Sequence, residues 1–186
     1  MAEQDVKKIA AKALILGAGL AGASVAIGLR KAGMAVEMAE QAAMIGGRSA
    51  EMGCKADSAC TRCNVCAGVR KIKDVWQDYS IRIHRRSALA AINTQSKGSR
   101  FCATLHKEPD FVSRELCTGC GACMAVCPTA AISIQRPAVA AGVPSFDPTL
   151  CLRGRGEECV LCRDACPTMA IDLTETARDF TVEADV

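Results

Sequence analysis

Twelve of the thirteen cysteines of this chain lie in three short runs, and thiolates at such spacings can hold iron–sulfur clusters. One run has the spacing C-x2-C-x2-C-x3-C, is followed by Pro128, and consists of Cys117, Cys120, Cys123 and Cys127. Another has the spacing C-x7-C-x2-C-x3-C, is followed by Pro167, and consists of Cys151, Cys159, Cys162 and Cys166. The tandem runs predict two [4Fe–4S] clusters and one-electron transfer. Structural zinc, held by four cysteines per site, is the alternative.

The fourth cysteine of each run lies too far along the chain to close its own cluster easily. In two-cluster ferredoxins this cysteine ligates the other cluster. One expected ligand set is therefore Cys117, Cys120, Cys123 and Cys166. The other is Cys151, Cys159, Cys162 and Cys127. Residues 152–158 (LRGRGEE) widen the second run, and their glycines and charges predict a solvent loop that would alter the potential of that cluster.

The third run has the spacing C-x5-C-x2-C-x2-C and consists of Cys54, Cys60, Cys63 and Cys66. Four ligands within thirteen residues can surround one cubane, so we expect a third [4Fe–4S] cluster here. Zinc, or partial ligation with a fourth ligand from elsewhere, remains open as an alternative. Cys102 stands alone and is expected to be a buried free thiol.

A glycine-rich turn near the N-terminus has the pattern of a dinucleotide-binding site. A short apolar strand at 13–16 leads into the turn, a helix to Lys31 follows, and a strand at 35–39 ends at Glu40. The candidate binding residues on the turn are Gly17, Gly19, Leu20, Ala21 and Gly22. The first glycine permits the tight turn, the second lets the backbone approach a pyrophosphate, and the third lets helix and strand pack closely. Glu40 would accept hydrogen bonds from a ribose.

A second glycine-containing segment follows shortly after, at Gly46, Gly47 and Arg48. It looks like the second phosphate contact of flavoproteins with two dinucleotide-binding domains. This similarity favours FAD over NAD as the cofactor. A plain loop is the alternative.

The composition is consistent with a cofactor-rich protein. Only 3% of the 186 residues are aromatic, so cofactors are expected to fill part of the core. The formal charge of +3 would fall to about −3 with three thiolate-bound clusters, so we expect no nucleic acid partner. The basic run 82–86 is expected to be a solvated face or a partner contact. Thiolate-bound metal implies a reducing compartment, here the cytoplasm.

An uncharged stretch at 13–29 follows Lys7, Lys8 and Lys12, as in an export signal. Its four glycines disfavour a membrane helix and fit the nucleotide turn instead, so no membrane span is expected.

The combined order of motifs resembles the A subunit of heterodisulfide reductase and related quinone-modifying or electron-bifurcating proteins. The segments that carry this resemblance are 17–22, 36–40, 45–48, 60–66, 101–109 and 116–121. Glutamate-synthase-type flavoproteins place their cysteines before the glycine turn, whereas here they follow it. In the resembled family the ferredoxin domain is inserted into the flavin domain, and later strands and a Gly-Asp segment complete the FAD site. No such segment precedes Val186, so the resemblance implies a truncated form. Either another polypeptide would complete its FAD site, or the FAD is missing, or the site is vestigial.

The expected fold is α/β plus α+β, a partial Rossmann-like FAD-binding βαβ domain with a two-[4Fe–4S] ferredoxin-like domain. The expected parts are the half-site 1–50, a cysteine loop with a helix and short strands 51–108, the ferredoxin domain 109–173 and a tail 174–186. The helix is expected at 69–79, and the short strands at 81–84, 89–92, 101–105, 131–134 and 170–173.

The expected function is that of an oxidoreductase subunit relaying electrons between FAD and [4Fe–4S] clusters within a multi-subunit complex. We find no acid–base pair or activated nucleophile that would indicate other catalysis. One alternative is a non-catalytic ferredoxin-type wire or scaffold whose truncated nucleotide fold binds no flavin. Another is a free ferredoxin with an NAD-binding domain, which the missing half of the flavin fold disfavours.

Overall fold

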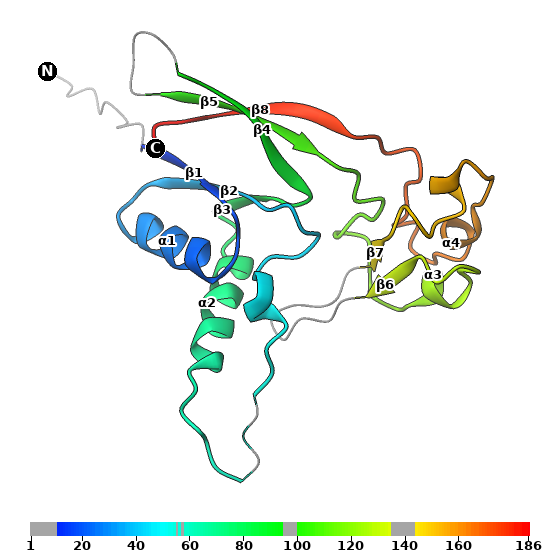
Figure 1. The fold of residues 1–186 in the computed structure, drawn as a ribbon, viewed down its shortest axis with the longest axis horizontal. Coiled ribbons are helices and arrows are strands. Elements are labelled where there is room, and N and C mark those ends of the chain that lie inside the picture. The colour runs from blue at the N-terminus through cyan, green and yellow to red at the C-terminus, as the bar shows by residue number, and fades with distance from the viewer. Residues whose placement is uncertain (1–10, 55, 57, 95–99, 135–143) are drawn as a thin grey trace, which may run out of the picture.

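The computed structural model describes residues 11–54, 56, 58–94, 100–134 and 144–186, and Lys7 and Lys8 lie outside this part. The chain forms two lobes (Figure 1). The helices are α1 (Leu20–Lys31), α2 (Val65–Gln77), α3 (Ala122–Ala125) and α4 (Leu161–Asp164), with 3-10 turns η1 (Gly47–Ala50) and η2 (Arg153–Arg155). The strands are β1 (Lys12–Leu16), β2 (Ala35–Ala39), β3 (Ile81–His84), β4 (Ser87–Thr94), β5 (Phe101–Lys107), β6 (Ile132–Ile134), β7 (Pro144–Phe146) and β8 (Arg178–Ala184). Within the described part, no helix is long and apolar enough to cross a membrane.

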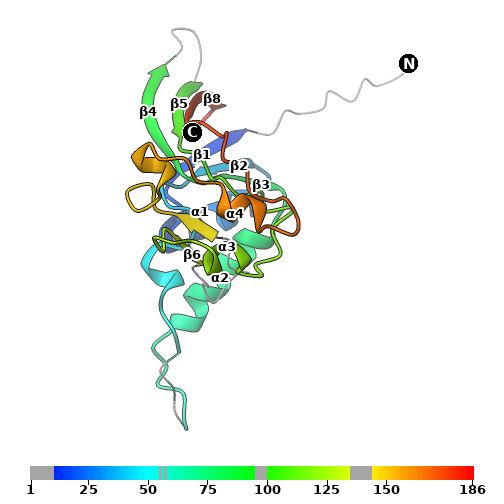
Figure 2. The same cartoon turned by 90° about the vertical axis from the view of Figure 1, so that its right-hand side faces the viewer.

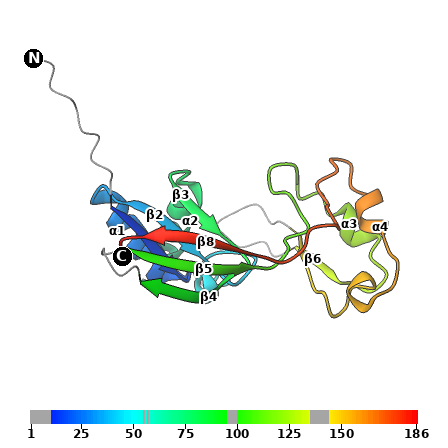
Figure 3. The same ribbon diagram turned by 90° about the horizontal axis from the view of Figure 1, so that it is seen from above.

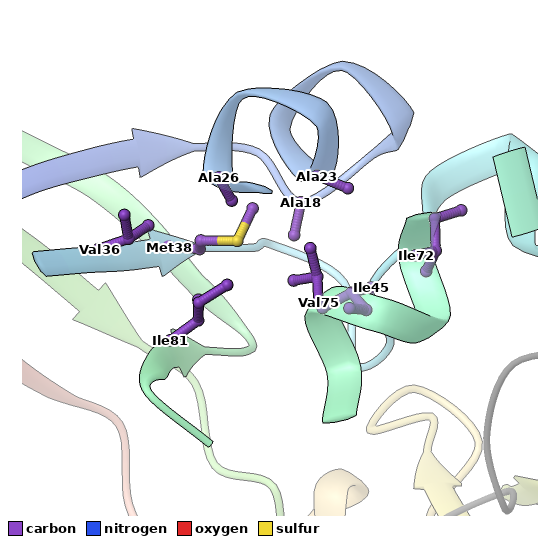
Figure 4. Close-up of a cluster of buried hydrophobic side chains, with 9 residues drawn as sticks. All are labelled: Ala18, Ala23, Ala26, Val36, Met38, Ile45, Ile72, Val75 and Ile81. Atoms are coloured by element: carbon purple, nitrogen blue, oxygen red, sulfur yellow. The ribbon is translucent and has the colours of Figure 1, made fainter. Parts of the chain in front are cut away.

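The first lobe contains a parallel sheet of order β1-β2-β3, with α1 and α2 as its crossover helices. Both helices pack on one face of the sheet around a core of nine buried residues (Figure 4). Ala23 and Ala26 let α1 approach the sheet closely, and Met38 fills the space between strand and helices. Gly33 has a positive φ of 83° and follows the last turn of α1. The expected Rossmann-like βαβ fold is confirmed.

The start of α1 is held against β1 by the absence of a side chain at Gly22. A Cβ atom there would lie 2.0 Å from the carbonyl oxygen of Gly17, which no real contact permits. Gly17 itself has a φ of 98°, in the region that favours glycine. The amide of Gly17 donates to the carbonyl of Ala39 at 2.7 Å, so the turn is fixed to the end of β2.

The second sheet is antiparallel, in the order β4-β5-β8, and the ferredoxin-type lobe is inserted between β5 and β8 (Figure 3). Residues 174–186 were expected to be a tail, but 178–184 form β8 and pair along the whole of β5. The amide of Asp185 then donates to the carbonyl of Lys12, and the amide of Leu14 donates to the carbonyl of Val186. These bonds place the main chain of 185–186 along the free edge of β1.

The second lobe is small and contains the two-stranded sheet β6-β7 and the short helices α3 and α4 (Figure 2). The strand expected at 170–173 is only an isolated bridge between Val112 and Ile171. A strand that the sequence did not predict, β7, pairs with β6. The core of the second lobe is composed of buried aliphatic residues together with Phe146, Cys123 and Cys162.

Charged side chains fix the two lobes to each other around Asp110. Its carboxylate contacts the guanidinium groups of Arg85 at 3.3 Å and Arg86 at 3.5 Å, and the amine of Lys107 at 2.8 Å. Arg86 also donates to the carbonyl of Phe146 in β7 at 3.2 Å. The expectation that the run 82–86 is a solvated face is therefore wrong for Arg85 and Arg86, because the side chain of Arg85 is buried in this junction and that of Arg86 is half-buried there.

A partly buried carboxylate, Glu37 on the central strand β2, joins neighbouring strands. It contacts the amine of Lys12 on β1 at 2.7 Å and the imidazole of His84 on β3 at 2.7 Å. Burial by itself would raise the pKa of Glu37, but the hydrogen bonds from His84 and Lys12 outweigh it and lower that pKa. The charge of Glu37 therefore stabilises the fold above the ordinary glutamate pKa, and this contribution is lost as pH falls through the lowered value.

Replacing Glu37 by glutamine should lower the free energy of unfolding at neutral pH by about 1–3 kcal/mol, because Lys12 loses its charged partner. The difference from the parent should shrink as pH falls below about 4.3. Urea unfolding followed by circular dichroism measures both. Arg82→Gln is the control, since Arg82 lies 4.0 Å from Glu37 with a side chain 74% exposed, and should change stability by less than about 0.5 kcal/mol. Equal losses in both variants would contradict the role assigned to Glu37.

Candidate redox-cofactor sites

The glycine turn, Glu40 and the Gly46–Arg48 segment meet at the carboxyl end of the parallel sheet. The amide of Gly46 donates to the carbonyl of Ala18 at 2.7 Å, and Gly46 forms a parallel bridge with Gly19. Gly46 has a φ of 111°, and a Cβ atom there would lie 2.7 Å from that of Ala50. Both the backbone angle and the space therefore require glycine at this position.

Glu40 braces the turn from the end of β2. Its carboxylate accepts hydrogen bonds from the amides of Ala18 at 2.8 Å and Ala42 at 2.9 Å. A carboxylate has about four acceptor positions, so capacity remains for ribose hydroxyls. The arrangement can thus hold the turn and a nucleotide at once.

The residues fit a pyrophosphate at the N-terminus of α1. Gly19 precedes the helix, and no side chain of the described residues caps this end. A Cβ atom at Gly19 would meet nothing within 4 Å, so the backbone faces open space. The first-turn amides, among them those of Leu20 and Ala21, have no acceptor within the helix and carry its positive dipole end. Arg48 lies in η1 with an exposed side chain.

One expected ligand set surrounds a single cavity in the second lobe. Cys127 from the first run lines this cavity together with Cys151, Cys159 and Cys162 from the second. The wall of this cavity is almost wholly apolar. The juxtaposition follows from β6, which begins shortly after Cys127 and pairs with β7, which leads to Cys151. Four thiols around an apolar space suit a compact inorganic core.

The other expected ligand set includes Cys117, Cys120 and Cys123, whose thiols lie close enough to oppose one another's ionisation. Burial raises the pKa of the Cys123 thiol, and the neighbouring Cys117 and Cys120 raise it further. In the same way, burial and then Cys159 and Cys151 raise the pKa of Cys162 to about 11. Crowded thiolates of this kind are stabilised by a cationic core, whose binding would release their protons.

The fourth cysteines of the two runs have the same local environment. The Cys127 thiol lies 3.8 Å from the Thr129 hydroxyl, and the Cys166 thiol lies 3.7 Å from that of Thr168. Burial would raise the pKa of both thiols, but nearby backbone amides outweigh it and lower both values. Ala130 and Met169 stand at equivalent positions, each with a φ of 52°. The repeated Cys-Pro-Thr segments therefore form a local pseudo-twofold.

The third run begins in the segment between η1 and α2 and ends at Cys66 in the first turn of α2. This segment projects away from both lobes (Figures 1 and 2). All four of its cysteines are exposed. Its last part, 60–66, has the same spacing as 117–123, and its backbone follows the same course. Arg62 and Asn64 have φ values of 56° and 60°, where the first run has Gly119 and Gly121 at 68° and 82°. A helix begins directly after each pair, with the third cysteine in its first turn.

The structure also qualifies the metal expectation. Among the described residues, no three His, Cys, Asp or Glu side chains converge closely enough to hold a single metal ion. The four cysteines that line the cavity in the second lobe surround a space and do not converge on a single point. A [4Fe–4S] core fits this arrangement when bound, because its four iron corners lie apart.

Sequence reasoning missed Arg153, which lines the same cavity as the four cysteines. Residues 152–158 were expected to be a solvent loop, and 153–158 are indeed exposed. The segment also contains η2 and is fixed by backbone hydrogen bonds. A Cβ atom at Gly154 would lie 2.0 Å from the carbonyl oxygen of Pro148, so the segment packs closely on the chain before Cys151. The sequence shows the charged residues of the insertion, but it does not show where they lie relative to the cysteines.

Cys102, expected to be buried, is half-buried on β5.

Two protein families match this chain in different segments. Residues 15–77 match an NAD(P)-binding Rossmann-like domain, which covers the glycine turn and α2. Residues 111–133 match a 4Fe-4S binding domain, which covers the first ferredoxin run. The chain therefore carries a dinucleotide-binding fold followed by a [4Fe–4S]-binding segment.

Solved structures with partial likeness include L-proline dehydrogenase from P. horikoshii, at 21% identity with a TM-score of 0.38. It covers 53% of this chain and 19% of that one. Another is a polycyclic ketone monooxygenase from Thermothelomyces thermophila, at 18% identity with a TM-score of 0.37, covering 57% of this chain and 21% of that one.

Curated relatives share sequence with most of this chain. The A subunit of the ferredoxin:CoB-CoM heterodisulfide reductase of Methanosarcina acetivorans is 29% identical over 90% of this chain and 22% of its own length. The A subunit of the H(2):CoB-CoM heterodisulfide,ferredoxin reductase of Methanothermobacter marburgensis is 26% identical over 92% of this chain and 27% of its own length. The chain thus spans about a quarter of the length of these relatives. These matches confirm the resemblance drawn from the motifs: the chain is similar in sequence to part of the A subunit of heterodisulfide reductase.

Proposed function

We propose that this chain is the electron-relaying part of an iron–sulfur flavoprotein subunit, in which electrons pass between FAD and [4Fe–4S] clusters. The observation that carries the proposal is the meeting of Cys127 with Cys151, Cys159 and Cys162 around one cavity. This is the crossed arrangement expected of a two-cluster ferredoxin. The relatives are subunits of heterodisulfide reductases, so the activity belongs to a multi-subunit oxidoreductase.

Crossed ligation would make the two halves of the second lobe interdependent. Each cluster would take three thiolates from one run and one from the other, namely Cys127 or Cys166. The segments α3 and α4 contact each other in the lobe core, with Cys123 and Cys162 buried there. Such packing supports a short separation between the two clusters and direct one-electron transfer.

The FAD would lie with its pyrophosphate at Gly17–Gly22 and its ribose at Glu40. When bound, the flavin supplies the conversion between two-electron and one-electron chemistry. This chain contributes the open backbone at Gly19, the helix N-terminus and the carboxylate that orients the turn. The carboxyl ends of β1–β3 point toward the second lobe, so a flavin there would face the cluster-binding unit (Figure 1). Further segments, in our proposal those of a partner protein in the complex, complete the pocket.

The third cysteine run would hold another [4Fe–4S] cluster. The shared backbone course of 60–66 and 117–123 supports this assignment over zinc, because both loops turn through left-handed residues at the same two positions. Non-glycine residues adopt that region only at an energetic cost, which ligand binding can offset. The exposed, projecting position of this loop suits transfer to a partner protein in the same compartment, which we propose to be the cytoplasm.

A non-catalytic scaffold remains the second candidate function. Glu40 is already satisfied by two backbone amides, as a structural brace would be. Flavin content separates the two candidates. Protein purified without oxygen together with its partner subunits should contain one FAD per chain, whereas a scaffold would contain clusters and no flavin.

Exchanging Cys127 for serine should disturb the same cluster as Cys162→Ser, although Cys127 belongs to the first run. Cys123→Ser and Cys166→Ser should disturb the other cluster. Each cluster lost should remove about four iron atoms per chain. Iron analysis and electron paramagnetic resonance of the reduced protein distinguish the two clusters.

The control for these exchanges is Cys102→Ser, which should leave both clusters intact because Cys102 lies on β5 in the other lobe. If Cys127→Ser disturbed the same cluster as Cys123→Ser, the ligation would be uncrossed and the assignment wrong.

Gly19→Val should abolish flavin binding while the protein stays folded, because a Cβ atom added there meets no protein atom within 4 Å and the side chain enters the space that faces the helix N-terminus. Flavin content after purification and the circular dichroism spectrum measure the two effects. Gly28→Ala is the control, since Gly28 lies on α1 with open space around it and away from the turn. Gly19→Val protein that retained a full complement of FAD would disprove the pyrophosphate site.

A further inference from the structure

The insertion in the second cysteine run places one cation beside one of the two ferredoxin-type sites. Arg153 lines the cavity formed by Cys127, Cys151, Cys159 and Cys162. Its backbone is held by η2, in which the amide of Gly156 donates to the carbonyl of Arg153 at 3.0 Å. The backbone conformation of the insertion therefore fixes where the side chain of Arg153 begins.

The neighbouring charges of the insertion lie elsewhere. Arg155 donates through Nε to the carbonyl of Thr149 at 3.0 Å and does not line this cavity. Glu158 lines a second, more open cavity with Arg153 and Cys159, and Glu175 lines a third with Arg153 and Cys151. Arg153 is thus the charged residue among those that line the cavity of the four cysteines. Because the wall of this cavity is almost wholly apolar and Arg153 is exposed, its aliphatic stem lines the cavity and its guanidinium lies toward solvent beside it.

The first cysteine run has no equivalent of this charge. Between Cys117 and Cys120 it contains only Thr118 and Gly119, where the second run has residues 152–158. The otherwise similar Cys-Pro-Thr segments of the two halves make this the main local difference between the sites. The insertion therefore gives one of the two pseudo-twofold related sites a neighbouring positive charge that the other lacks.

A [4Fe–4S] core with four thiolates becomes more negative by one unit charge when it accepts an electron. A fixed cation at its side stabilises the reduced form more than the oxidised form and so raises the reduction potential. The wall around Arg153 in the cavity is apolar, which weakens screening by water. The exposed part of the side chain reduces the effect without changing its sign.

We propose that Arg153 is a potential-setting residue, whose guanidinium raises the reduction potential of the cluster held by Cys127, Cys151, Cys159 and Cys162. This inference rests on the proposed [4Fe–4S] ligation. The exchange concerns one electron, taken up by the cluster from a one-electron donor without bond formation. The insertion thereby makes the two clusters unequal, which gives the electron a preferred position in the pair.

The test is a redox titration of the full chain, purified without oxygen, with the reduced clusters followed by electron paramagnetic resonance. Arg153→Gln should move one of the two one-electron steps to a more negative potential and leave the other in place. The step that moves should be the one altered by Cys159→Ser. Arg153→Lys, which keeps the charge, should retain most of the parent potential.

Arg155→Gln is the matched control, because it removes the same charge two residues away and outside the cavity. It should shift both steps less than Arg153→Gln does. Equal shifts in Arg153→Gln and Arg155→Gln would overturn the inference, as would equal shifts in Arg153→Gln and Arg153→Lys. Loss of the cluster from Arg153→Gln alone would also count against it, because the residue would then act in assembly.

Iron and sulfide analysis of the parent protein keeps the two proposals apart. A parent chain without cubane clusters would defeat the proposed function, and the inference with it. A parent chain with both clusters but with potentials insensitive to residue 153 would defeat the inference alone.

Discussion

The pairing of β5 with β8 is the constraint on which the arrangement of the molecule depends. The register runs from Phe101 opposite Ala184 to Lys107 opposite Arg178. Because these strands are neighbours in one sheet, the chain that leaves β5 must return to the same point. The carboxylate of Glu175 closes this neck by accepting hydrogen bonds from the amides of Asp110 and Phe111 at 3.0 and 2.9 Å. The second lobe is thereby attached by two adjacent strands and not by one flexible linker.

The charged junction then fixes the orientation of the attached lobe. Three cations contact Asp110, and Arg85 is buried among them, where desolvation lowers its pKa and the Asp110 charge opposes the shift. Arg114 stacks over Trp76 of α2 at 3.7 Å from the ring centroid, which adds a second contact between the lobes. Electron transfer requires a fixed separation between cofactors, and these contacts provide the means to hold it.

The second lobe has few large side chains with which to stabilise itself. Its core contains Cys123 and Cys162 as buried members, alongside one phenylalanine and small aliphatic residues. Burial raises the pKa of both of these thiols, and neighbouring cysteines raise it further. Cluster binding would thus serve both folding and electron transfer, as it does in other small metal-binding domains.

Much of the local structure could be predicted from the sequence. The strands 35–39 and 81–84 have the expected bounds, because a short apolar run flanked by turn residues defines a buried strand. The helix expected at 69–79 lies at Val65–Gln77 instead. Its buried face, Ile72 and Val75, follows the helical period, but its start is set by the left-handed Asn64 of the cysteine loop. Tyr79, the last residue of the expected helix, lies beyond its observed end and is fully exposed.

Residue type and spacing alone therefore predicted which cysteines and glycines would hold clusters and a nucleotide, since those patterns are local along the chain. Only the tertiary structure decided that 178–184 is a strand, that β7 exists, and that Arg85 and Arg86 contact Asp110. It also decided that Arg153 lines the cavity. Each of these features depends on contacts between segments that are distant in sequence. Local residue patterns do not predict the free energy of such contacts.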